Sequence, residues 1–185
     1  MKTKFTSLSV LVLALSFGLS MSAFAQGNID NHNITVVIPT VALLDIEPSG
    51  SKDITATFVA PTEAGDKITL PANNTSLWLN YSSIQTGSTL KRVSVEADVL
   101  VAGIDINLVA GASGTGDGTL GTPQAALTLT MDPQILVNGI GSAYTVSGQN
   151  QGHQLTYSFV AADDNYANIR SGSPVVVVTY TLEDY

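Results

Sequence analysis

The chain has 185 residues, no cysteine, two histidines and a formal net charge of −8 at pH 7. The missing cysteines exclude a disulfide framework and a thiolate metal site, and the negative charge is opposite to that of a nucleic-acid-binding surface. Charged residues make up 12% of the chain and hydrophobic residues 44%, the reverse of the composition of disordered proteins.

The first 25 residues have the three parts of a secretory signal peptide. Lys2 and Lys4 form the positive region, residues 8–19 are mostly apolar, and Ala23–Ala25 has the small-x-small pattern that precedes a cleavage site. The apolar run is short for a membrane span, and no stop-transfer pattern follows it. We therefore expect cleavage before Gln26, no membrane span after cleavage, and export to the periplasm, the cell surface or the extracellular medium.

Residues 26–185 are predicted to form a single domain. Two of the seven Lys and Arg residues leave with the signal, so five remain against 15 Asp and Glu residues. A chain of this length buries about 70% of its unfolded surface without help from disulfides or metals. No linker-like composition divides the segment, and no internal repeat has a fixed period.

The dominant hydrophobic period in this domain is two. Short runs rich in Val, Ile, Thr and Tyr lie between clusters of Gly, Pro, Asn and Asp, a pattern typical of β-strands joined by turns. The longest run alternates apolar residues with charged or small polar ones, as in an antiparallel strand with one wet face. In chain order the predicted strands are 34–38 continuing into 41–46, 54–59, 76–82, 90–101, 104–109 in a hairpin with the run before it, 125–131, 144–146, 153–160 and 174–182.

The remaining segments contain little helix. Residues 163–169 predict at most a single turn, and the glycine-rich stretch Gly111 to Gly121 predicts an exposed loop between two strands. Four consecutive valines in the last predicted strand, 174–182, indicate that both of its faces are covered. The predicted fold class is all-β, a single Ig-like antiparallel β-sandwich with Greek-key-type connections.

Some residues match functional motifs by letter, but the secondary structure or spacing that each motif needs is absent. Residues 116–121 match G-x-G-x-x-G by letter, but a phosphate site needs a helix after the turn, and a strand pattern follows here. His32 and His153 are the only histidines for a triad, and they lie near the mature N-terminus and at a strand start. Residues 163–165 lack the alternating oxygen spacing of a calcium loop. We predict no catalytic, cofactor-binding or metal-binding residue, and hence no enzyme.

The one tryptophan has two interpretations. Trp78 lies in a predicted strand with Tyr81 nearby, and a large aromatic side chain in a strand is typical of a core. Aromatic faces also stack on sugars, so Trp78 and Tyr81 are the candidate ligand contacts if the protein binds a glycan.

Two segments near the ends of the mature chain carry a family resemblance. Residues 34–39 read ITVVIP, an alternating apolar stretch, and residues 175–182 read VVVVTYTL, with a tyrosine near the C-terminus. They resemble the N-terminal arm and the closing strand of secreted bacterial fimbrial, pilin-like β-sandwich subunits. Residues 152–157, GHQLTY, are similar to stretches of secreted bacterial proteins of this kind. The disulfide of many chaperone–usher subunits is absent from this chain.

The resemblance implies assembly by strand addition, in which an arm from one subunit fills a groove in the next. Ile34, Val36 and Ile38 would be the inserted side chains, with Thr35 and Val37 facing outward. The alternative is that this segment is the first strand of its own sandwich. We therefore expect a non-catalytic, exported structural or adhesive surface protein whose partners are copies of itself or related subunits. The alternative function is a secreted carbohydrate- or protein-binding module.

Overall fold

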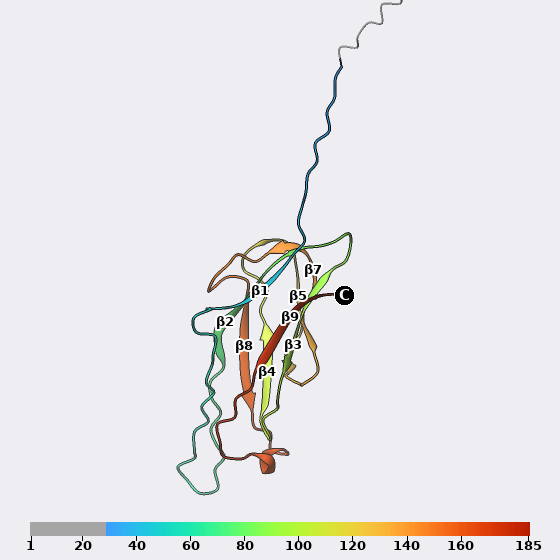
Figure 1. Cartoon of the computed structure of the whole chain (residues 1–185). Coiled ribbons are helices and arrows are strands. Elements are labelled where there is room, and N and C mark those ends of the chain that lie inside the picture. Colours follow the sequence, from blue (N-terminus) through green and yellow to red (C-terminus); the bar gives the residue numbers. More distant parts are fainter. Residues whose placement is uncertain (1–28) are drawn as a thin grey trace, which may run out of the picture. The chain divides into compact units, whose positions relative to one another are not determined.

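The computed structural model describes residues 29–185 of the chain. The predicted signal peptide, residues 1–25, lies outside the described residues. The described residues divide into an N-terminal segment that ends at Val37 and a compact unit from Ile38 to Tyr185. Residues 29–40 contain no strand and have exposed side chains throughout, and they form the plain blue tube before β1 in Figure 1.

The regular secondary structure of the compact unit is nine β-strands and one short 3-10 helix, η1 (Tyr166–Asn168). The strands are β1 (Val41–Glu47), β2 (Asn74–Ile84), β3 (Lys91–Ala97), β4 (Asp105–Ala110), β5 (Asp117–Pro123), β6 (Leu127–Thr128), β7 (Gln134–Tyr144), β8 (His153–Val160) and β9 (Val178–Asp184).

These strands form one antiparallel ladder that is folded into two layers (Figure 1). One layer has the order β1–β2–β8–β4–β6 and the other β5–β7–β3–β9, joined where Ser82 and Ser83 pair with Tyr144 and Ala143. Only β1 and β2 are neighbours in both sequence and ladder, so most connections cross between layers, as Greek-key connections do. The predicted all-β antiparallel fold is confirmed.

The core lies between the two layers. In β8 every second residue from His153 to Phe159 is buried, which is the pattern of a strand with one face on a core. Between the layers the hydroxyl oxygens of Tyr157 on β8 and Tyr180 on β9 lie 2.5 Å apart. The buried hydrophobic cluster comprises Leu77, Leu79, Tyr81, Val93, Val95, Ala97, Leu108, Ala110, Leu129, Leu136, Val137, Ile140, Leu155, Tyr157 and Phe159.

The predicted strands agree best with the observed ones where apolar and polar residues alternate without interruption. The predicted strand 153–160 has the same bounds as β8, and η1 lies within the predicted turn at 163–169. The run 90–101 forms a strand only to Ala97, and Val99 beyond it is exposed.

Several sequence-based predictions were wrong about pairing. Residues 104–109 do not form a hairpin with the preceding strand, because β4 pairs with β6 and β8 in the other layer. Residues 54–59 alternate in burial but form only one bridge, between Val59 and Thr69. The segment 174–177 is not a strand, and Val175 and Val177 are exposed while Val176 packs on the core, so only one face is covered.

The 11-residue strand β7 was missed except for its last residue. Its sequence is interrupted by Asn138–Gly139 and Gly141, which are turn signals by composition. Gly139 has a φ of 75°, and the register against β3 shifts between the pairs made by Val137 and Ile140. A β-bulge therefore lies inside a continuous strand, and bulges are a common position for glycine within strands.

The predicted flexible loop at Gly111 to Gly121 is also corrected, because its second half begins β5, which pairs with β7. A Cβ atom on Gly118 would lie 2.2 Å from the carbonyl oxygen of Ser142, and Gly118 has a φ of 90°. The glycine is thus required by close backbone approach and by a left-handed conformation, and not by loop flexibility.

We predict that Gly118→Ala lowers the free energy of unfolding by about 1–3 kcal/mol, because the added methyl group meets backbone in a strained conformation. Gly114→Ala is the matched control, since nothing lies within 4 Å of its Cβ position, and a change within about 0.5 kcal/mol is expected. Urea denaturation of both variants checks the prediction, and equal losses would contradict it.

Candidate functional site

The first candidate surface is the N-terminal arm, residues 29–40. Ile34, Val36 and Ile38 are 71–76% exposed. The described segment has no strand, and pairing begins only at Val41. Residues 34–38 are therefore assigned to no strand, and the two interpretations of this segment remain predictions. The arm carries three alternate apolar side chains that are exposed.

The second candidate surface is formed by two strands with a free edge. Among the described residues β1 is paired only with β2, and β9 only with β3. The two strands lie in contact with one another although they belong to different layers. Each presents a row of backbone N–H and C=O groups, which is a template for an additional strand.

The core is incompletely covered at the same strands. Nine of the twelve partly buried apolar side chains that pack on the core come from three segments near the two ends of the compact unit. One of these segments, 54–58, alternates in burial outside any named strand. We call these nine residues the open seam: Leu44, Ile46, Ile54, Ala56, Phe58, Val176, Val178, Tyr180 and Leu182.

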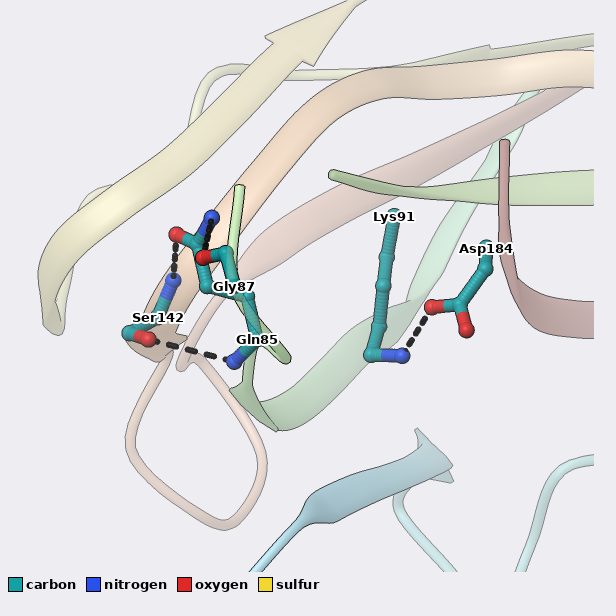
Figure 2. Close-up of polar contacts among 5 residues, drawn as sticks. All are labelled: Gln85, Gly87, Lys91, Ser142 and Asp184. Atoms are coloured by element: carbon teal, nitrogen blue, oxygen red, sulfur yellow. Dashed lines mark hydrogen bonds and ion pairs between the residues drawn. The ribbon is translucent and has the colours of Figure 1, made fainter. Parts of the chain in front are cut away.

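Polar contacts fix the ends of β2 and β9 (Figure 2). Lys91 on β3 forms an ion pair with Asp184 on β9. After β2, the backbone N–H of Gln85 donates to Ser142 Oγ at 3.2 Å, and the Ser142 N–H donates to Gln85 Oε1 at 3.1 Å. The Gln85 side-chain amide also donates to the Gly87 carbonyl. β9 is thereby tied to β3, and the end of β2 to β7.

A second ion pair supports β9. Arg92 Nε lies 2.9 Å from Glu183 Oε1, on the opposite face of the strand pair from Lys91 and Asp184. The hydrogen bond from Arg92, followed by one from Ser94, lowers the pKa of the Glu183 carboxyl. Both residues are partly exposed, so the pair contributes little to stability and mainly orients the strand end.

His153 forms a buried structural cluster with Tyr81. Its Nε2 lies 2.9 Å from the Tyr81 hydroxyl oxygen and its Nδ1 lies 2.8 Å from the Gly111 carbonyl oxygen. The Tyr81 hydroxyl also contacts the carbonyl oxygen of Leu120 on β5. Burial lowers the pKa of His153 and raises the pKa of Tyr81. Because both imidazole nitrogens are engaged, the geometry joins β2, β5 and β8 and leaves no nitrogen to accept a substrate proton.

Trp78 and Tyr81, the predicted ligand contacts, lie on opposite faces of β2. Tyr81 is buried in the core, whereas Trp78 is half-buried and pairs in register with Glu47 of β1. Their spacing of three residues places them on opposite faces of any regular strand. They therefore do not form one platform, and only Trp78 lies on the outer face.

The remaining candidate residues do not come together. His32 is exposed in the N-terminal arm, and Asp163 forms an ion pair with Lys67. Within residues 29–185 no group of three or more His, Cys, Asp or Glu side chains is placed to hold a metal ion. Over the same residues no helix is long and apolar enough to cross a membrane.

No family model, curated protein or solved structure matches this chain. Its function is therefore inferred from its own residues and contacts.

We predict that the protein loses stability as the pH falls below about 6.5, the ordinary pKa of histidine. The folded state lowers the pKa of His153, so in acid the unfolded chain binds the extra proton more readily and is favoured. The stabilising contribution is complete above that pH and is lost as the pH falls toward the folded-state pKa.

Urea midpoints measured between about pH 7.5 and pH 5 check this prediction. His153→Gln should reduce the pH dependence of the midpoint, whereas His32→Gln, a change at an exposed residue, should leave it as in the wild type. An unchanged pH profile in His153→Gln would show that other groups cause the acid loss.

Proposed function

We propose that this protein is a non-catalytic, exported structural subunit that assembles with copies of itself by strand addition. The N-terminal arm of one copy adds as a strand along the open seam of the next. The observation that carries this proposal is the presence in one chain of an exposed, alternating apolar arm and an incompletely covered core beside the free edges of β1 and β9.

The two surfaces have matching periods. Ile34, Val36 and Ile38 alternate along the arm, and the last four seam residues, at positions 176–182, alternate along the C-terminal segment. In an added strand, backbone hydrogen bonds provide affinity, and pockets for alternate side chains provide register. A shift of one residue would turn the apolar face of the arm to solvent, so this pattern favours a single register.

Pro39 favours pairing of the arm with a second copy over pairing with β1 of its own chain. Only Pro39 and Thr40 separate Ile38 from β1. A two-residue hairpin needs a positive φ at its first loop position, and the proline ring fixes φ near −65°. The arm therefore cannot fold back on β1 through a tight hairpin, and strand addition to another molecule meets no such restriction.

Burial of the arm is a main favourable contribution to strand addition. Full burial of an Ile or Val side chain contributes about 1.5–3 kcal/mol relative to exposure, and three such residues are available. Backbone pairing adds to this and offsets the ordering of the arm, which costs about 1–2 kcal/mol for each residue fixed.

We predict that the purified mature protein gives a heat-sensitive ladder on an unboiled denaturing gel and large species by light scattering. Val36→Asp should abolish the ladder, because it places a charge among the inserted side chains. Thr35→Asp is the matched control, since it adds the same charge on the opposite face and should leave the ladder intact. A wild-type monomer at high concentration, or a ladder that survives Val36→Asp, contradicts the proposal.

A direct test uses an arm-less chain that begins at Thr40. We predict that a synthetic peptide of residues 28–40 raises the melting temperature of this chain. A ligand at 100 times its Kd stabilises a folded protein by about 2.7 kcal/mol. A peptide with Val36→Asp should have no effect, and failure of the unchanged peptide to stabilise the arm-less chain would count against the open seam as its site.

A further inference from the structure

A shallow hollow lies on the outer face of β1 and β2, next to the end of β7. Its volume is about 310 Å³. Leu43 pairs with Ser82 and Ser82 pairs with Tyr144, so these three side chains stand in one row across three strands. The small Ser82 forms the floor between two large side chains, both of them exposed.

One rim of the hollow is held in a strained conformation. Val146 has a φ of 72°, which is unfavourable for a β-branched residue. Its neighbour Thr145 is buried and fixed on both sides: its N–H donates to the Tyr81 carbonyl at 3.1 Å, and its Oγ1 accepts from the Tyr81 N–H at 3.0 Å. Thr115 Oγ1 donates to the Thr145 carbonyl at 2.5 Å. These bonds hold the exposed Val146 side chain at the hollow, and such strain concentrates at ligand sites.

The charged groups that line the hollow are two carboxylates, Asp45 and Glu47. Asp45 Oδ1 lies 3.3 Å from Lys52 Nζ, and Glu47 Oε2 accepts from the Ser49 N–H at 2.7 Å. The second oxygen of each carboxylate has no hydrogen-bond donor among the described residues. The lining contains no Lys or Arg. Two carboxylates repel an anionic ligand, and their free oxygens suit hydroxyl donors.

We propose that this hollow binds a neutral hexopyranose unit of a glycan. The C–H face of the sugar lies on the Tyr144 ring between Leu43 and Val146, and its hydroxyl groups donate to Asp45 and Glu47. Aromatic walls with a few polar groups that fix orientation are the usual composition of small-ligand sites. The site goes beyond the proposed assembly and does not depend on it.

The test uses the mature protein and four neutral oligosaccharides that end in glucose, galactose, mannose or N-acetylglucosamine. Trp78, the only tryptophan, is opposite Glu47 in the β1–β2 register and reports binding by fluorescence. Backbone amide NMR shifts provide a second readout. At up to about 10 mM sugar, which detects even a millimolar complex, at least one oligosaccharide should shift Ser82, Tyr144 and Val146. Adding a terminal sialic acid should weaken binding about tenfold or more.

Variants distinguish a loss of sugar binding from a loss of folding. Tyr144→Ala should weaken binding about tenfold or more, whereas Tyr185→Ala, which removes a tyrosine of similar exposure, 51% against 53%, should not. Val146→Gly should keep or raise the urea midpoint while weakening binding about tenfold, because glycine adopts this φ without strain. No shift with any of the four sugars, shifts confined to other residues, or undiminished binding by Tyr144→Ala would overturn the proposal.

Discussion

The unpaired edges of β1 and β9 are the constraint on which the rest of the structure depends. A strand edge leaves backbone groups open to pairing, and proteins usually protect such edges with charges, bulges or short strands. Here the charges on β9 stand at its end, where Glu183 and Asp184 pair with Arg92 and Lys91. The middle of the strand, from Val178 to Leu182, has no such protection. The free edges of β1 and β9 are therefore open to pairing beside the open seam.

Charge favours a short-range mode of assembly. Four of the five Lys and Arg side chains within residues 29–185 are in ion pairs, and the fifth, Arg170, donates to the carbonyls of Ala167 and Ile169. Most of the carboxylates in this part of the chain have no cationic partner there, so two copies repel one another at long range. In the proposed assembly, attraction comes from apolar burial and backbone pairing at close contact, which are the interactions that strand addition provides.

Strands that are determined by local sequence pattern were predicted correctly, whereas strands that depend on contacts between distant segments were missed. β8 was predicted with correct bounds because its alternation is local and unbroken, and residues 54–58 show the correct faces although they form no ladder. β7 and β5 were missed because glycines such as Gly118 and Gly139 are compositionally turn residues. They are needed here for contacts with strands distant in sequence, which no local pattern contains. The hairpin predicted after Ala97 failed for the same reason, since β4 and β3 belong to different layers.

The two proposed surfaces share β1 and are separated by its alternation. Leu44 and Ile46 face the core at the open seam, whereas Leu43 and Asp45 face outward into the hollow. The odd spacing of Trp78 and Tyr81 was sufficient to exclude a shared platform, but the row of Leu43, Ser82 and Tyr144 depends on cross-strand register and lay beyond sequence analysis. Because a strand added along the seam inserts its side chains toward the core, it leaves the outer face uncovered. Because alternate residues of β1 face opposite sides of the sheet, the proposed assembly and the proposed ligand binding can both use this strand.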